Sequence, residues 1–102
     1  MVIVNINCGV EKTMKIIGKK WSILILRDLF DGKKRFSQIL LSLDEISPRT
    51  LSLRLKEFEK NKIVTKKVYK EIPLHVEYSL TKKGESLHEI IKDLRCWGEE
   101  FG

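Results

Sequence analysis

The sequence lacks the features that mark several protein classes. Its 102 residues include only two cysteines, Cys8 and Cys96, which form neither a disulfide framework nor a set of metal ligands. No apolar run approaches the roughly 20 residues that a membrane-spanning helix needs. The first residues, MVIVNINC, lack a basic start followed by a long apolar stretch, so we expect no signal peptide. These absences favour an intracellular, cytoplasmic protein with reduced thiols and no membrane partner.

Motifs of enzymes are also missing. The sequence contains no glycine-rich phosphate loop, no nucleophile elbow and no HExxH pattern. His75 and His88 have no cysteine or carboxylate neighbours at metal-ligand spacing, so a structural or surface role is favoured for each. We therefore predict a protein that is not an enzyme and has no catalytic residue, metal or cofactor.

The positive charge of the chain is concentrated in one part of it. Hydrophobic residues make up 42% and charged residues 33%, as in an ordinary globular protein, and we expect one domain over residues 1–102. Residues 47–83 hold ten basic and four acidic residues, a net charge of +6, whereas residues 84–102 have a net charge of −3. Such a field attracts polyanions, although a solvated lysine-rich surface is the simpler alternative.

Apolar spacing predicts four helices in the first 60 residues. Residues 10–17 form a short amphipathic helix ended by Gly18, and residues 21–30 are apolar nearly all round, which indicates a central core helix. A basic cluster, Lys33-Lys34-Arg35, precedes a two-turn helix over residues 36–43. Ser47-Pro48 begins the next helix, and the short connection between these two helices predicts a helix-turn-helix.

The helix that follows Ser47 has two different faces. At about 100° per residue, Leu51, Leu55 and Phe58 share a narrow arc that should face the core. The opposite side presents polar and basic residues together with one leucine: Arg49, Ser52, Leu53, Lys56 and Lys60. Thr50 and Arg54 fall on a flank. This basic outward face is what a DNA groove would meet.

The last 40 residues predict a hairpin and a final helix. Residues 63–69 and 75–80 are rich in β-branched and aromatic residues, and they predict a two-stranded antiparallel hairpin around the loop 70–74. Thr81 is a suitable N-cap for one helix that continues to about residue 101. Its apolar stripe is broad enough to need a partner, for which a second subunit is a candidate: Leu87, Ile90, Ile91, Leu94 and Trp97.

Cys8 has two interpretations. It precedes the first predicted helix by two residues, and the positive end of a helix favours a thiolate. Lys12 adds positive potential, whereas Glu11 opposes it. A redox-sensing thiol and an inert small residue both fit the local sequence. Cys96, beside Trp97, is predicted to fill the core or an interface.

From Cys8 to Trp97 the chain resembles the HxlR-type winged helix-turn-helix transcription regulators. The resemblance is carried by CGVEKTMKIIGKKWSILILRDLFDGKKRFSQIL, ISPRTLSLRLKEFEKNKIV and VYKEIPLHVEYSLTKKGESL. It implies a homodimer joined by the first and last helices, with two recognition helices in successive major grooves. It also implies an oxidant or electrophile response, because several relatives use a cysteine at the place of Cys8. The wings of this family often carry a basic residue where this chain has His75, and the recognition helices often carry glutamine where it has Leu53.

Together these observations predict a mainly helical α+β fold, a winged helix-turn-helix with a two-stranded wing. Its predicted function is sequence-specific binding of double-stranded promoter or operator DNA by a homodimer. The residues expected to contact DNA are Arg49, Ser52 and Lys56 at bases or adjacent phosphates, Arg35, Ser47 and Thr50 at the backbone, and Lys70 from the wing. The residues expected in the dimer contact are Val10, Met14, Leu87, Ile91, Leu94 and Trp97. A protein-interaction module without DNA readout is the alternative, which the charge of residues 47–83 disfavours.

Overall fold

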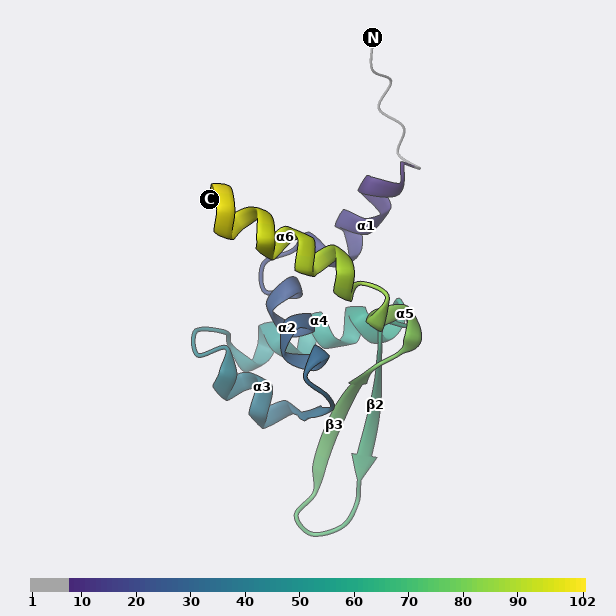
Figure 1. Ribbon diagram of the computed structural model, residues 1–102. Coiled ribbons are helices and arrows are strands. Elements are labelled where there is room, and N and C mark those ends of the chain that lie inside the picture. The colour runs from purple at the N-terminus through teal and green to yellow at the C-terminus, as the bar shows by residue number, and fades with distance from the viewer. Residues whose placement is uncertain (1–7) are drawn as a thin grey trace.

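The computed structural model describes residues 8–102 (Figure 1). The expectation of no signal peptide concerns residues 1–7, which lie outside the described residues. The elements in chain order are α1 (Gly9–Ile17), α2 (Ser22–Phe30), β1 (Lys34–Arg35), α3 (Phe36–Ser42), α4 (Pro48–Lys60), β2 (Val64–Tyr69), β3 (His75–Leu80), α5 (Lys82–Glu85) and α6 (His88–Phe101). The predicted mainly helical winged helix-turn-helix is confirmed. Figure 1 shows α1 and α6 at one end of the molecule and the loop of the β2–β3 hairpin at the other.

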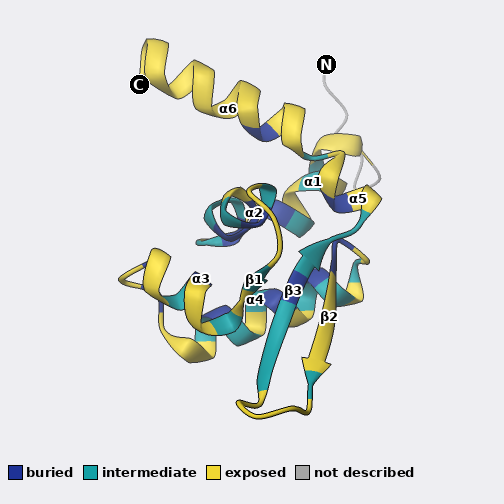
Figure 2. Cartoon of the chain, turned by 60° about the horizontal axis from the view of Figure 1, so that its bottom comes forward, coloured by how far each residue is buried: buried dark blue, intermediate teal, exposed yellow. Residues whose placement is uncertain are grey.

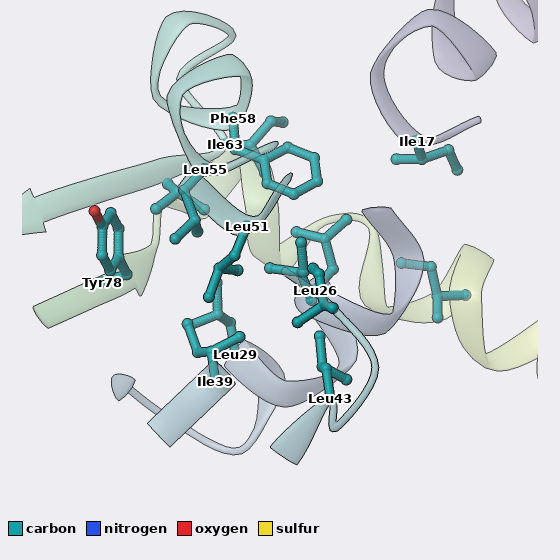
Figure 3. Packing of buried hydrophobic residues seen from close by; sticks show 14 residues of the cluster. Ile17, Leu26, Leu29, Ile39, Leu43, Leu51, Leu55, Phe58, Ile63 and Tyr78 are labelled. Atoms are coloured by element: carbon teal, nitrogen blue, oxygen red, sulfur yellow. The ribbon is translucent and has the colours of Figure 1, made fainter. Parts of the chain in front are cut away.

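The core is organised around α2, as its apolar sequence predicts. This helix packs against α1, α3, β3 and α6. Ile25, Leu26 and Leu29 of α2 are buried, and they meet the buried face of α4, which is formed by Leu51, Leu55 and Phe58 (Figure 3). Ile39 of α3 and Tyr78 of β3 belong to the same cluster. Burial, and after it the negative charge of Glu59, raises the pKa of the Tyr78 hydroxyl.

The sheet has three strands where a two-stranded hairpin was predicted. The strand order is β1-β3-β2 and all pairs are antiparallel. β2 pairs with β3 from Val64 opposite Leu80 to Tyr69 opposite His75, while Lys34 and Arg35 pair with Tyr78 and Glu77. The basic cluster ahead of α3 is thus partly a strand, which ties the start of α3 to the wing.

The final helix is also different from the prediction, because it is broken into α5 and α6. Thr81 caps α5 as expected, with its Oγ1 accepting from the Gly84 backbone N–H at 3.0 Å. Gly84 lies so close to the Ile63 carbonyl oxygen that an added Cβ would collide with it. The chain then turns at Ser86 and Leu87, which places Leu87 on the core and lets α6 leave in a new direction.

Candidate nucleic-acid interface

The α3–α4 pair forms the predicted helix-turn-helix. The turn between the helices is held from inside by Leu43 and Ile46, which are both buried, and the Ile46 backbone N–H donates to the Leu43 carbonyl at 2.8 Å. Because the turn is anchored in the core, the beginning of α4 has a fixed position relative to α3.

Local hydrogen bonds hold the start of α4. Ser47 has an extended backbone, and its Oγ accepts from the Thr50 backbone N–H at 3.0 Å. The same hydroxyl donates to Thr50 Oγ1 at 2.9 Å. Pro48 occupies the first turn, where its missing N–H costs no hydrogen bond. The predicted cap is confirmed, and it occupies two of the polar side chains that were expected to contact the DNA backbone.

The outer face of α4 is basic and accessible. Arg49, Leu53, Lys56 and Lys60 are exposed, whereas Ser52 is half-buried beside them. Within residues 8–102 none of the three cations makes an ion pair with a carboxylate. Their charges are therefore available to an external anion. This geometry fits a helix that lies in a groove of DNA with its basic residues toward the phosphates and base edges.

Arg54, on the flank of α4, forms contacts within the protein and is not available to DNA. Its side chain is only 16% exposed, and its Nη1 lies 2.7 Å from Glu57 Oε1. Its Nε donates to the Lys20 carbonyl at 3.4 Å, and Lys19 Nζ reaches the same Glu57 oxygen at 3.2 Å. These contacts tie α4 to the segment that leads into α2.

Two further predicted DNA contacts come from outside the helix-turn-helix. Arg35 is exposed at the junction of β1 and α3, where its backbone N–H donates to Gln38 Oε1 at 2.8 Å. Lys70 is exposed at the end of β2, where the wing loop begins. Figure 2 shows the β2–β3 hairpin extending beyond α3 and α4, with most of β2 exposed.

The wing carries two exposed lysines that were not predicted as site residues. Lys66 and Lys67 both lie on β2, and Lys67 Nζ is 4.9 Å from the centre of the Tyr69 ring. The available signal in the sequence was a pair of adjacent lysines inside the predicted strand 63–69. As consecutive residues of a strand, they present their charges on opposite faces of the hairpin.

Glu77 is the carboxylate that organises the base of the wing. Its oxygens lie 3.7 Å from Lys33 Nζ and 3.6 Å from His75 Nε2. Burial alone would raise the pKa of Glu77, but a hydrogen bond with Tyr69 and the positive charges of Lys33 and His75 lower it below the usual value. The negative charge of Glu77 is thus balanced within the protein by Lys33.

Exposed apolar side chains lie on α1 and α6, at the end of the molecule opposite the wing (Figure 1). They include four of the six predicted dimer residues, Val10, Met14, Leu94 and Trp97, together with Ile90 and Phe101, and all six side chains are exposed. Leu87 and Ile91, also predicted there, are covered by the core of their own chain. A hollow of about 480 Å³ lies beside the contact of α2 with α6, with Leu24 and Leu94 among its walls. We call the six exposed residues the α1–α6 surface.

The two cysteines are free and exposed. Cys8 is the N-cap residue of α1, and its carbonyl accepts from the Lys12 backbone N–H at 3.0 Å. Its sulfur makes no capping hydrogen bond. Cys96 lies on α6 beside Trp97 and is not part of the core of this chain.

The histidines take structural positions. His75 stacks on Tyr69 with ring centres 4.6 Å apart, and His88 meets Phe30 edge-on at 4.8 Å. Residues 8–102 contain no group of three side chains suited to a metal ion. In the same part of the chain, no helix is both long and apolar enough to cross a membrane.

Comparison with known proteins agrees with this geometry. The family model described as HxlR-like helix-turn-helix matches residues 16–102. The HTH-type transcriptional regulators YdeP and YodB of Bacillus subtilis are 43% and 40% identical to this chain, over 93% and 89% of it and 74% and 81% of their own lengths. The solved structure of the redox regulator HypR in its reduced form superposes with a TM-score of 0.86 at 40% identity, covering 91% of this chain and 92% of that one. With its α3–α4 pair and wing, this chain belongs to the HxlR-like helix-turn-helix family of transcription regulators.

Proposed function

We propose that this protein regulates transcription by binding double-stranded promoter DNA sequence-specifically, as a homodimer, in the cytoplasm. The observation that carries the proposal is the outer face of α4, where Arg49, Lys56 and Lys60 are exposed without an internal carboxylate partner. The cap at Ser47 and the buried turn hold this face in a fixed orientation. Regulation by binding requires no catalytic step.

Within this proposal the residues have different tasks. Arg49, Ser52 and Lys56 lie toward the N-terminal half of α4, where recognition helices meet base edges in the major groove. Arg35, Ser47 and Thr50 flank the helix start and serve the DNA backbone, with Lys70 acting from the wing. Contacts to phosphates fix the register, whereas contacts to base edges supply the specificity.

The test begins by selecting bound sequences from a random DNA pool and measuring affinity over a salt series. Arg49→Ala should weaken binding to the selected sequence by about 1–3 kcal/mol, as expected for the loss of a base contact. Arg27→Ala is the matched control, because Arg27 is exposed on α2, away from the α4 face. Equal affinity of Arg49→Ala and wild type at every salt concentration would overturn the assignment. A flat salt dependence of the wild type would favour protein docking instead.

The homodimer is supported by the α1–α6 surface. Several large exposed apolar residues at one end of a molecule are typical of a protein interface. A second copy covering this surface would place two α4 helices on one side of the DNA, about one helical turn apart. Leu94→Glu should then produce monomers in sedimentation velocity and weaken operator binding. Leu41→Glu is the control for the sedimentation measurement, since Leu41 is 82% exposed but lies on α3, away from α1 and α6. A Leu94→Glu protein that still sediments as a dimer would contradict this arrangement.

We also infer that Cys8 makes the regulator responsive to oxidants. The residue is exposed at the start of α1, next to the surface assigned to the dimer. HypR, a structurally similar protein, is named as a redox regulator, and YodB has been solved in a reduced and a diamide-treated form. Oxidation at this position would act on the contact between subunits and thereby on the spacing of the α4 helices.

A further inference from the structure

The tip of the wing is apolar and unprotected. Ile72 is 100% exposed and Leu74 is 72% exposed, and Pro73 between them is exposed as well. Apolar residues on the neighbouring strand behave differently, since Val76 packs against the core and Tyr78 is buried. Single exposed leucines are ordinary in proteins, but three consecutive apolar residues at the most remote point of a hairpin are not.

The loop is held in place from its base. Tyr69 and His75 are the last pair of the β2–β3 ladder, and their rings stack at 4.6 Å with an angle of 12° between the planes. His75 Nδ1 lies 3.0 Å from the Pro73 carbonyl oxygen, which can only accept, so this hydrogen bond requires a proton on Nδ1. A loop ordered in advance loses less conformational entropy when it binds.

The charged residues near the tip favour a polyanion as its partner. Lys66, Lys67 and Lys70 are exposed on β2 and at its end, and Glu71 is the one exposed carboxylate in the loop 70–74. Glu77 is engaged with Lys33 and His75. An apolar tip that follows a strand with exposed lysines fits an anionic partner with an apolar opening. The minor groove of DNA is such a partner, because phosphates line both of its rims and apolar side chains can insert between its base steps.

We propose that Ile72, Pro73 and Leu74 enter the minor groove of the bound DNA as an apolar wedge beside the site read by α4. Isoleucine, leucine and proline are among the side chains that proteins insert against base steps, where they partly unstack them and bend the duplex. Pyrimidine–purine steps such as TA and CA are the easiest to unstack, so operators should carry one where the tip lies. This inference rests on the proposed function. It gives the wing an apolar contact with DNA in addition to the charged contact proposed for Lys70.

The experiment compares four proteins on the operator selected from the random pool. Ile72→Ser/Leu74→Ser removes the apolar groups without changing the charge, and the folding of this exposed loop variant is checked by its melting temperature. Ile72→Leu/Leu74→Ile keeps the apolar volume and serves as the matched control. Lys70→Ala removes one charge from the same loop. A 2-aminopurine placed at the step facing the tip reports unstacking through its fluorescence.

The double serine variant should bind roughly tenfold or more weakly than wild type, with an unchanged slope of log affinity against log salt. It should also lose the rise in 2-aminopurine fluorescence, whereas the leucine–isoleucine exchange keeps both. Lys70→Ala should instead reduce the salt slope by about one. Wild-type affinity and fluorescence in the double serine variant would overturn the wedge while leaving the proposed function intact.

The same protein set distinguishes two other outcomes. If the wild-type protein selects no sequence from the pool, both the proposed function and the inferred wedge are wrong. Anionic phospholipid vesicles are the second probe, because a membrane surface is also apolar within and anionic outside. Vesicle binding that disappears in the double serine variant, together with unchanged operator affinity, would assign the tip to lipid and overturn its role on DNA.

Discussion

Arg54 and Glu57, one turn apart on α4, are joined by a hydrogen-bonded ion pair of 2.7 Å, and the same Glu57 oxygen accepts from Lys19 at 3.2 Å. The helix assigned to DNA is therefore anchored to the segment before α2 on its inner flank, while its outer cations are unpaired within the described residues. The two arginines of α4 thus differ in their roles. Arg49 is proposed to contact DNA, whereas Arg54 holds the helix in the fold.

Glu57→Gln should lower the free energy of unfolding by about 1 kcal/mol, because the pair is partly shielded and two cations share one carboxylate. For a domain of this size that corresponds to a fall in melting temperature of about 4–8 °C, measured at fixed protein concentration. Glu59→Gln is the control, since Glu59 lies on the same helix and makes no ion pair within residues 8–102. Equal melting temperatures of the Glu57→Gln variant and the control would show that the pair contributes nothing.

Ser47→Ala should destabilise the protein by about 1 kcal/mol, since it removes the oxygen that accepts from the Thr50 backbone N–H. Ser47→Asn should retain most of the stability, because asparagine is an equally good N-cap. Urea unfolding measures both. Ser37→Ala, at an exposed position of α3, provides the reference for removing a hydroxyl elsewhere. A loss in Ser37→Ala as large as that in Ser47→Ala would remove the cap as the explanation.

Glu77 predicts a dependence of stability on acid pH. Its pKa in the folded protein is lowered, despite the opposing effect of burial, by Tyr69, Lys33 and His75. A carboxyl whose folded pKa lies below its unfolded value stabilises the fold above the unfolded pKa, and this contribution disappears as the pH falls through the folded pKa. The free energy of unfolding, measured from about pH 7 to about pH 3, should therefore decline less steeply in Glu77→Gln than in wild type. Glu85→Gln, at an exposed position of α5, should keep the wild-type slope.

Most of the fold could be predicted because its helices carry their apolar residues at helical spacing. The buried positions of α4, Leu51, Leu55 and Phe58, are those assigned from the helical wheel. The strand β1 could not be predicted, since two basic residues have no periodicity and their pairing partners, Tyr78 and Glu77, are far along the chain. The break between α5 and α6 was missed for a similar reason, because the contact of Gly84 with Ile63 is a tertiary one.

The site was predicted less completely than the fold. Sequence spacing separates the inner and outer faces of α4, but it does not show which cation on a flank finds a carboxylate. It also cannot show that Leu87 and Ile91 are covered by their own chain while Leu94 and Trp97 remain exposed. The change of direction before α6 determines that difference. The sequence places Ile72, Pro73 and Leu74 in the predicted loop 70–74, but the exposure of their side chains is a property of the folded hairpin.

The thiol of Cys8 gives the last prediction. If it is the sensor, diamide should change the affinity of wild-type protein for the selected operator, and dithiothreitol should restore it, because a disulfide forms and is then reduced. Cys8→Ser should bind the operator and ignore diamide. Cys96→Ser identifies the second thiol, because a disulfide between the Cys8 residues of two copies would form without Cys96, whereas a disulfide between Cys8 and Cys96 would not. Non-reducing electrophoresis of the three proteins shows whether the disulfide joins two copies of the chain. A Cys8→Ser protein that responds as wild type does would exclude Cys8 as the sensor, and loss of the response in Cys96→Ser alone would assign the sensing to α6.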